Sequence, residues 1–373
     1  MFLSSWYPSK VIPTLGNFVQ KHAEAIASMH RVTALYITGA ANQSEKFVLD
    51  DRVINGVETV VVYYQQEKNN FLTKWRAFQH ALTFLKKNER FNFDLVHFNV
   101  IWNAGWQALW MKKRYGLPYL ISENFTGFDT SSRTDQPVGL KIFSQMVTRN
   151  AAFVCPVTIN LKEVMQRFGL NGHYRIVPNV VNTDLFRIHQ LSEKSIRFLH
   201  VSTLNDAHKN ISGMLRCWKK CSDELPHIHL KIGGDGPYEA FSRMADELGI
   251  RRDSISFFGT KTPSEVAGLM QESDCLLMFS NYENLPLVII EALASGMAII
   301  STNAGGIAEH IDASLGIIIQ KKDENALVEA IHNYAKNPGK FRPDQQREYA
   351  VNHFGISSVA KQFDLLYRQM ISK

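Results

Sequence analysis

Short β-branched runs alternate with stretches of helical period along this chain, and no other feature constrains its fold as strongly. The runs expected to form buried parallel strands are residues 32–38, 57–63, 95–100, 119–122, 198–202, 229–233, 255–258, 275–279 and 298–302. Apolar residues recur at helical spacing between them, in residues 17–29, 71–88, 103–115, 210–221, 238–248 and 263–272. Strands that alternate with helices of this length indicate βαβ units and parallel sheets.

The alternation runs twice, once on each side of Pro178 and Asn179, where a linker is expected. A length of 373 residues is enough for two domains that each bury a core. We therefore predict an α/β fold of two Rossmann-like domains facing each other across a cleft, with ligands at the carboxyl ends of the strands. The predicted parts are an N-terminal domain over residues 1–178, a C-terminal domain over 179–355, and a final helix over 356–373 that returns to the N-terminal domain.

The charge of the chain is uneven along its length. Its formal net charge is +6, short of the clustered basicity expected of a nucleic-acid binder, so no nucleic-acid partner is predicted. Residues 1–180 hold 20 Lys and Arg against 12 Asp and Glu, a net of +8, whereas residues 181–373 hold 21 against 23, a net of −2. The two halves are therefore expected to meet different partners.

Neither a signal peptide nor a membrane span is predicted. Pro8 follows only a short apolar run, and the longest apolar tract, residues 285–300, is interrupted by polar residues and is shorter than the roughly 20 residues of a spanning helix. The 4 cysteines do not form a disulfide framework or a zinc-site spacing. These features predict a cytoplasmic protein that is soluble or lies on a membrane surface.

Two glutamates eight residues apart are the strongest candidates for chemistry. Glu283 lies in a polar turn after a predicted strand, and Glu291 follows on a predicted helix over residues 287–295. Glu291 stands among apolar residues, where a carboxylate needs a partner, and ligand hydroxyls are one such partner. The alternative is a solvated glutamate on the outer face of an amphipathic helix.

Other candidates are glycines and polar residues that follow predicted strands. Gly234 belongs to the glycine-rich turn IGGDGP, a second glycine pair lies in NAGGIAE, and Lys209 lies in a polar loop. In the first half, Gly16 precedes a helix, and His97 and the pair Glu123 and Asn124 lie at strand ends. Glycines before helices suit a close approach to phosphate. Each of these residues also has an ordinary structural explanation, as a turn, a solvated lysine or a buried histidine.

Together these segments resemble the retaining glycosyltransferase family 4 of the GT-B fold, over almost the whole chain. The segment FSNYENLPLVIIEALASGMAIISTNAGGIAEHI resembles the family's donor-site signature, and IGGDGP resembles its G-x-GP turn. The segments PTLGNFVQKHAEAI, VPNVVNTDLF, DLVHFN and YLISENFTGF are similar to further parts of the family pattern.

The resemblance implies a hexosyltransferase that uses a nucleotide-diphosphate-sugar donor and needs no metal or other cofactor. It implies that Glu291 binds the ribose hydroxyls, and that Glu283 holds the transferred sugar together with the amides of Asn284, Leu285 and Pro286. Lys209 and the amide of Gly16 would neutralise the diphosphate. The further donor-binding positions are Gly234 and Thr203, and the acceptor-side positions are His97, Glu123 and Asn124.

The implied acceptor is a glycan or lipid-linked saccharide of surface polysaccharide or glycolipid biosynthesis. A basic amphipathic helix over residues 71–90 suggests, further, an anionic membrane surface at the inner face of the cytoplasmic membrane. The alternative for this helix is ordinary packing on a sheet with a solvated basic face.

Several positions depart from the family pattern, among them Asn99 and residues 284–286, and two of them, Thr203 and Asn124, keep alternatives open. Thr203 stands where an arginine beside the diphosphate is common, and Asn124 stands where a histidine is usual. An asparagine can hydrogen-bond a sugar hydroxyl but cannot carry a proton. A degenerate sugar-nucleotide-binding or scaffolding protein is therefore the second hypothesis, and a GT-B nucleotide-sugar epimerase is the third.

Overall fold

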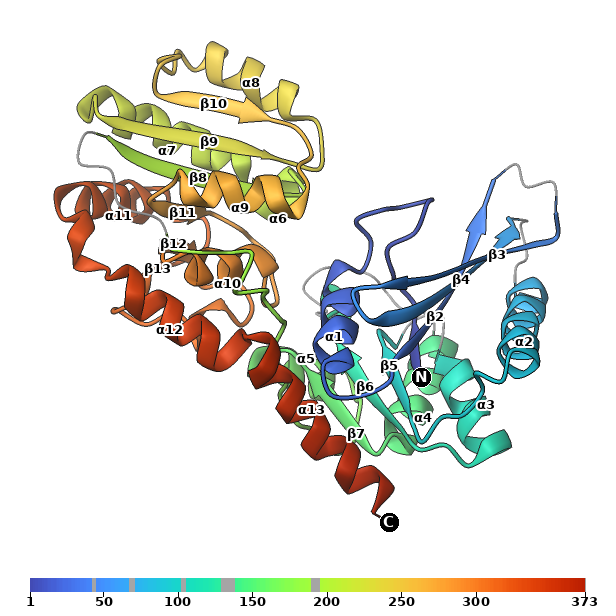
Figure 1. Ribbon diagram of the computed structural model, residues 1–373. Coiled ribbons are helices and arrows are strands. Elements are labelled where there is room, and N and C mark those ends of the chain that lie inside the picture. The colour runs from blue at the N-terminus through green and yellow to red at the C-terminus, as the bar shows by residue number, and fades with distance from the viewer. Residues whose placement is uncertain (42–44, 67–70, 102–104, 129–137, 189–194, 373) are drawn as a thin grey trace. The chain divides into compact units, whose positions relative to one another are not determined.

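The computed structural model describes residues 1–41, 45–66, 71–101, 105–128, 138–188 and 195–372, which form two compact units (Figure 1). Unit 1 comprises Met1–Val157, Lys162–Asn179 and Val359–Lys373, and unit 2 comprises Thr158–Leu161 and Val180–Ser358. The main division after Asn179 lies one residue from the predicted boundary. Residues 158–161, which lie inside the predicted N-terminal domain, belong with unit 2.

Unit 1 is built on a seven-stranded sheet of order β3-β4-β2-β1-β5-β6-β7. Only β3 runs antiparallel to its neighbour, and the remaining pairs are parallel. The strands are β1 (Phe2–Ser4), β2 (Thr33–Ala40), β3 (Phe47–Ile54), β4 (Val57–Gln65), β5 (Val96–Asn99), β6 (Tyr119–Glu123) and β7 (Phe153–Pro156). The central strands are buried, as near-continuous apolar runs in parallel sheets require.

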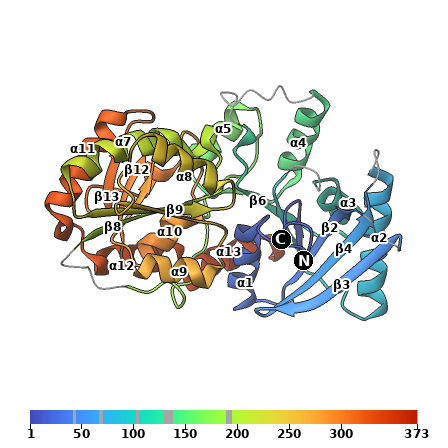
Figure 2. The ribbon, with the colours of Figure 1, turned by 90° about the horizontal axis from the view of Figure 1, so that it is seen from above.

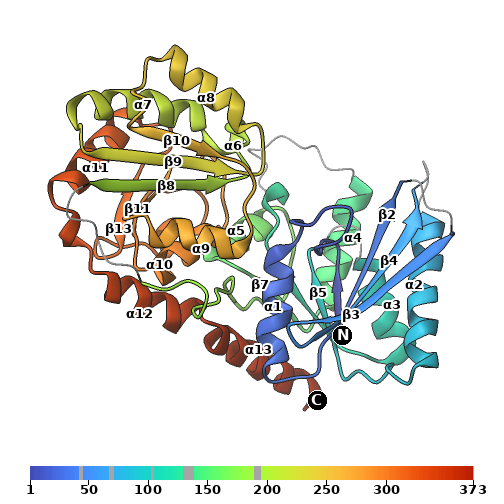
Figure 3. The same cartoon turned by 45° about the horizontal axis from the view of Figure 1, so that its top comes forward.

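Helices cover both faces of the unit 1 sheet. Its helical elements are α1 (Asn17–Ala27), α2 (Phe71–Lys87), α3 (Gly105–Tyr115), η1 (Thr126–Phe128), α4 (Val138–Asn150) and the later parts of α5 (Ile159–Arg167) and α13 (Ile356–Ile371). Figure 3 shows α2 and α3 beside each other on one face and α1 with α13 on the other. The predicted helix 103–115 begins in the structure at Gly105, and Asn103 lies outside the described residues.

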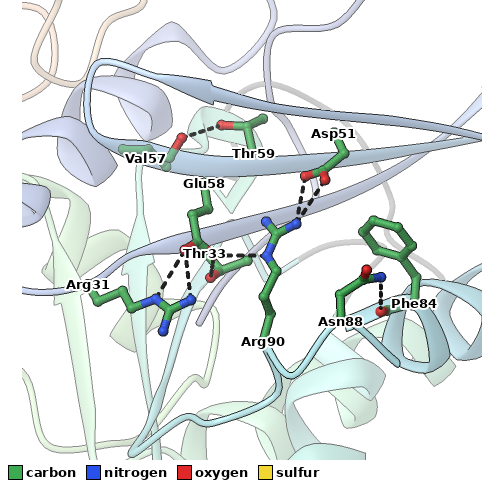
Figure 4. A network of polar contacts seen from close by, with 9 residues as sticks. All are labelled: Arg31, Thr33, Asp51, Val57, Glu58, Thr59, Phe84, Asn88 and Arg90. Atoms are coloured by element: carbon green, nitrogen blue, oxygen red, sulfur yellow. Dashed lines mark hydrogen bonds and ion pairs between the residues drawn. The ribbon is translucent and has the colours of Figure 1, made fainter. Parts of the chain in front are cut away.

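An ion-pair network fastens the antiparallel edge of this sheet (Figure 4). Arg90, just after α2, donates from Nη1 to both oxygens of Asp51 on β3, at 3.0 and 2.8 Å, and from Nε to Glu58 on β4 at 3.2 Å. Glu58 also accepts hydrogen bonds from Arg31 and Thr33. These partners lower the pKa of Glu58 below its usual value, against the burial that raises it. The network ties the edge strands to the end of α2.

Unit 2 is built on a wholly parallel six-stranded sheet of order β10-β9-β8-β11-β12-β13. The strands are β8 (Ile196–Ser202), β9 (Ile228–Gly234), β10 (Ile255–Phe258), β11 (Cys275–Met278), β12 (Ala298–Thr302) and β13 (Gly316–Ile319). A buried core of aliphatic and aromatic side chains surrounds Trp218, Phe198 and Tyr334 beside this sheet.

The helices of unit 2 also lie on both faces of its sheet (Figure 2). They are α6 (Asp206–Lys209), α7 (Ile211–Glu224), α8 (Tyr238–Glu247), α9 (Pro263–Gln271), α10 (Leu287–Ala294), η3 (Ile307–Glu309), α11 (Glu324–Lys336), η4 (Pro338–Lys340), α12 (Pro343–Phe354) and the first residues of α13. The prediction of two Rossmann-like α/β domains is confirmed at the level of the fold. Several elements were not predicted, among them the short strand β1, the antiparallel β3 and the edge strand β13.

The last helix contributes its later part to the core of unit 1. Phe363 is fully buried, with ring centroids 5.4 Å from His22 and 4.8 Å from His97. Tyr367 contacts His97 through a hydrogen bond of 2.6 Å between its hydroxyl and Nδ1. Among the described residues, no helix is long and apolar enough to cross a membrane.

Replacing Phe363 with alanine should lower the stability of unit 1 by about 3–5 kcal/mol, because it removes a buried ring and leaves a cavity. The matched control is Leu365→Ala on the same helix, whose side chain is 60% exposed and whose removal should change stability by less than about 0.5 kcal/mol. Urea unfolding of both variants measures the difference. Equal losses would contradict this docking of α13.

Candidate functional site

The strand order of unit 2 reverses between β8 and β11, and this reversal determines where its polar side chains meet. From β8 the chain moves outward to β9 and β10, then returns to β11 and continues to β12 and β13 on the other side. Loops that leave the carboxyl ends of β8 and β11 therefore diverge to opposite faces of the sheet, and ligands of open α/β sheets bind at such a point. The β8 loop carries Lys209 and the β11 loop carries Glu283.

Lys209 and Glu283 form an ion pair at this switch point. Lys209 is the last residue of α6, and its Nζ donates to Oε1 of Glu283 at 2.5 Å. The two side chains are only 14% and 7% exposed. The sequence predicted each residue separately as a functional candidate, and the fold brings them into direct contact over 74 positions of sequence separation.

The backbone of α6 holds the Glu283 loop. Asn205 caps α6 by accepting a hydrogen bond from the amide of His208, and the carbonyl oxygen of His208 accepts one from the amide of Asn281 at 2.7 Å. The side-chain amide of Asn281 also donates to the carbonyl oxygen of Ala207 at 3.0 Å. The two loops are thus joined independently of the ion pair, so the pair can open without separating them.

The glycine pair of the NAGGIAE segment supports the same loop from the other side. Gly305 has a φ of +60°, and a Cβ added there would lie 2.0 Å from the carbonyl oxygen of Glu283. The amide of Gly306 donates to the carbonyl oxygen of Asn284 at 3.0 Å. The expectation that this pair's amides meet an anion therefore does not hold for Gly306, whose amide holds the protein's own chain.

Glu291 lies on α10 and is 9% exposed, so it is not the solvated glutamate of the alternative interpretation. The residues between the two glutamates are closely packed, with Asn284 9% and Leu285 2% exposed. Pro286 precedes the helix with an extended backbone, and it has no amide hydrogen. The expected amide contribution of residues 284–286 to sugar binding is therefore limited to Asn284 and Leu285.

The glycine-rich turn packs against the end of β8. Gly234 has a φ of +133°, and an added Cβ would lie 1.9 Å from the carbonyl oxygen of Ser202. Glycine is needed here for the approach of one strand end to another, whatever else the turn contacts. Thr203, where the family commonly has an arginine, is exposed at the same strand end.

His200 is a further residue of this region that the sequence analysis missed. Its Nδ1 lies 2.8 Å from the carbonyl oxygen of Leu277, and its Nε2 lies 2.8 Å from Oγ of Ser202. Burial lowers the pKa of His200 to about 4. A neutral histidine therefore links the ends of β8 and β11 beneath the switch point, and a single polar residue inside a strand run was its only sequence signal.

Unit 1 has its own reversal of strand order, between β1 and β5. The loop after β1 leads to Gly16, which has a φ of +74° and precedes α1. An added Cβ on Gly16 would lie 2.6 Å from the carbonyl carbon of Trp6, so this glycine lets the loop fold back on itself. The expected assistance of its amide at the diphosphate stays a prediction.

Glu123 is a buried carboxyl that organises the strand ends of unit 1. Its Oε1 accepts hydrogen bonds from the amides of Asn124 and Phe125, and its Oε2 accepts one from the amide of Ile101, each at 2.9 Å. Burial raises the pKa of Glu123 to about 7, and the three amides oppose that rise. The carboxyl thus supports the surrounding backbone, and the side-chain amide of Asn124 donates to Asn179 at 3.3 Å.

His97 lies in the core of unit 1. It is fully buried, its Nε2 lies 2.7 Å from Oγ of Ser122, and its Nδ1 is bound to Tyr367. Burial holds the pKa of His97 well below its usual value. Both ring nitrogens are used within the protein, so we leave His97 out of the acceptor residues and assign it to the docking of α13.

Two family models match the chain and together extend over most of it. The model "Glycosyl transferases group 1" matches residues 181–353, and the model "Glycosyltransferase Family 4" matches residues 15–185. The chain belongs to the group 1 glycosyltransferases. It is therefore a glycosyltransferase of the GT-B fold, as the resemblance implied.

Named relatives and solved structures agree with this assignment. The glycosyltransferase is 24% identical to D-inositol 3-phosphate glycosyltransferase of Corynebacterium jeikeium, over 83% of this chain and 78% of that one. It is 22% identical to alpha-monoglucosyldiacylglycerol synthase of Streptococcus pneumoniae, over 70% of this chain and 61% of that one. Sucrose-phosphate synthase of Thermosynechococcus elongatus has the same fold, with a TM-score of 0.79 and 19% identity over 100% and 98%. The structure of Anabaena HepE in complex with UDP-glucose superposes with a TM-score of 0.73 and 14% identity, and covers 100% of this chain and 99% of that one.

Substituting alanine for Gly305 should destabilise unit 2 and displace the Glu283 loop. A left-handed backbone costs a non-glycine residue about 1–2 kcal/mol, and the new Cβ would overlap the carbonyl oxygen of Glu283. We expect a fall of several degrees in Tm by calorimetry and a loss of glycosyl transfer. Gly339→Ala is the control, because a Cβ there meets nothing within 4 Å. A Gly305→Ala protein with unchanged stability and activity would contradict this role.

Proposed function

We propose that the protein is a retaining hexosyltransferase that moves a sugar from a nucleoside diphosphate to a glycan or lipid-linked acceptor in surface polysaccharide or glycolipid biosynthesis. The observation that carries the proposal is the Lys209 and Glu283 pair at the strand-order reversal of unit 2. A cation for a diphosphate and a carboxylate for sugar hydroxyls stand side by side where the fold places ligands. Solved structures of the same fold in complex with UDP and with UDP-glucose support a nucleotide-sugar donor.

The proposed roles follow from the charges that develop during transfer. The bond between the anomeric carbon and the diphosphate oxygen breaks, and negative charge grows on the leaving group. Lys209 stabilises that charge through its ammonium group. The acceptor hydroxyl attacks the same face of the sugar, and its proton passes to the leaving phosphate. Configuration is thereby retained, and the proposal includes no metal or other cofactor.

Unit 2 is the proposed donor domain. In this proposal Glu283 holds the transferred sugar together with the amides of Asn284 and Leu285, and Glu291 accepts hydrogen bonds from the ribose hydroxyls. The turn at Gly234 lies at the neighbouring strand end. Thr203 offers a hydroxyl where an arginine would add a second charge, which leaves Lys209 as the principal cation of the proposed diphosphate site.

The exposed Thr203 also favours a second candidate, a sugar-nucleotide-binding or scaffolding protein without efficient transfer. The two candidates differ in one measurable respect. A transferase hydrolyses its nucleotide sugar slowly when no acceptor is present, whereas a binding protein leaves it intact. Release of the nucleoside diphosphate over hours, measured by chromatography, would favour transfer.

An aromatic and basic surface on α2 and α3 supports a lipid-linked acceptor and a peripheral membrane location. Phe71 and Leu72, at the start of α2, are 58% and 64% exposed. Behind them the Trp75 ring lies 5.2 Å from the rings of both Trp106 and Trp110. The same two helices carry basic residues, at Lys74, Arg76, Lys86, Lys87, Lys112, Lys113 and Arg114. Aromatic and basic side chains together suit an anionic lipid surface, and one relative is named for a glycolipid synthase.

Replacing Glu291 with glutamine should weaken nucleotide-sugar binding roughly tenfold to a hundredfold, because hydrogen bonds to a charged group contribute about 1.5–3 kcal/mol. The substitution keeps the size of the buried side chain. Isothermal titration with the nucleotide sugar measures the change in affinity. Glu348→Gln, at an exposed position on α12, is the control. Unchanged donor affinity in Glu291→Gln would refute the role assigned to this residue.

The double substitution Phe71→Ser and Leu72→Ser should reduce binding to vesicles of anionic phospholipid by at least about tenfold, because two exposed apolar side chains no longer enter the interface. Co-sedimentation at low salt measures this, and binding of the wild type should weaken as salt rises. Val53→Ser removes a 70% exposed apolar side chain from β3 and serves as the control. Absence of wild-type binding at low salt would refute the membrane proposal.

A further inference from the structure

We infer that the ion pair between Lys209 and Glu283 is an internal competitor for the diphosphate, which makes the site select an intact nucleotide sugar over a free nucleoside diphosphate. The inference rests on the donor site proposed for unit 2 and concerns the ligand-free state of that site. In this state the cation expected to meet the ligand already has an anionic partner, at 2.5 Å.

The surroundings of the pair make its opening costly. The Lys209 and Glu283 side chains are 14% and 7% exposed. When the pair opens, water therefore compensates little for the partner that each charged group loses. Within the described residues, neither side chain has a second ion pair. A ligand that takes Lys209 alone therefore leaves a nearly buried carboxylate without its cation.

The backbone geometry allows the pair to open locally. Hydrogen bonds from Asn281 to the carbonyl oxygens of Ala207 and His208 hold the two loops together, and Gly305 packs under Glu283. None of these contacts uses the Lys209 ammonium or the Glu283 carboxylate. Opening thus requires a change of side-chain rotamer and leaves the backbone in place.

A free nucleoside diphosphate and an intact nucleotide sugar differ in whether they offer the Glu283 carboxylate a new hydrogen-bond partner. A free diphosphate offers its negative charge to Lys209 and brings that charge near the Glu283 carboxylate, which opposes binding. An intact nucleotide sugar adds hydroxyl donors, which the carboxylate can accept in place of the ammonium. Only the second ligand satisfies both partners of the opened pair. After transfer the pair can close again, which favours release of the nucleoside diphosphate.

The first measurement uses inorganic pyrophosphate, which carries the diphosphate charge and neither base nor sugar. Isothermal titration of the full chain should show Glu283→Gln binding pyrophosphate about tenfold more tightly than the wild type, because Lys209 no longer has an anionic partner. Glu272→Gln is the matched control. It removes a carboxylate of unit 2 that contacts Lys231 at 2.8 Å and should leave pyrophosphate affinity unchanged.

The second measurement compares UDP-glucose with UDP and GDP-mannose with GDP. In the wild type the nucleotide sugar should bind at least about tenfold more tightly than its free diphosphate. In Glu283→Gln this ratio should fall to about one or below, as the free diphosphate gains affinity and the sugar loses a carboxylate. A purely structural salt bridge would change the Tm of the variant but not this ratio.

The outcomes separate the inference from the proposed function. Equal or weaker pyrophosphate binding by a folded Glu283→Gln protein overturns the inference, and Glu283→Ala repeats the test if the glutamine variant does not fold. Tighter pyrophosphate binding supports the inference. If that result occurs while no nucleotide sugar binds the wild type, the competition stands and the proposed donor function fails.

Discussion

The reversal of strand order in a parallel sheet is the constraint on which the rest of this structure depends. Strands on either side of the reversal send their loops to opposite faces, so side chains between those loops are not covered by a crossover helix. In unit 2 the reversal lies between β8 and β11 and brings Lys209 to Glu283. The other contacts of the site, from Asn281, His200 and Gly305, hold these two loops in place.

A division between supporting and reactive groups follows from this arrangement. His200 is neutral because burial lowers its pKa to about 4. Its two ring nitrogens are hydrogen-bonded to Leu277 and Ser202, near the ends of β11 and β8. The glycines at 234 and 305 allow backbone approaches that a side chain would block. Lys209 and Glu283 are held by backbone contacts around them, while their charged ends interact only with each other among the described ion pairs. Those ends are therefore available to exchange partners.

Much of the centre of unit 2 could be predicted from the sequence because β11 and β12 are buried along their whole length. The run 275–279 is entirely apolar and the run 298–302 begins with three apolar residues, and the lengths of both match β11 and β12 closely. Strands that carry polar residues or are very short, such as β3 and β1, lack that signal. The helix over Val138–Asn150 was missed although it is amphipathic, since no predicted strand followed it.

The candidate site was predicted residue by residue, but its contacts were not. Glu283, Glu291 and Lys209 were found by spacing and resemblance, whereas their mutual distances depend on a crossover that no local pattern encodes. His97 shows the opposite case, because a histidine at a strand end looks functional until its partners, Tyr367 and Ser122, are seen. In both cases, the Lys209 and Glu283 pair and His97, the role of the residue depends on partners that are distant in the sequence.

The measurement that tests the donor assignment most directly is a thermal-shift screen of the wild type with UDP-, GDP- and ADP-sugars. A ligand that binds only the folded protein stabilises it by about 2.7 kcal/mol at one hundred times its Kd. We predict that at least one of these nucleotide sugars raises the unfolding temperature, and by more than the corresponding free nucleoside diphosphate. A screen in which no nucleotide sugar shifts the transition would contradict the proposed donor site.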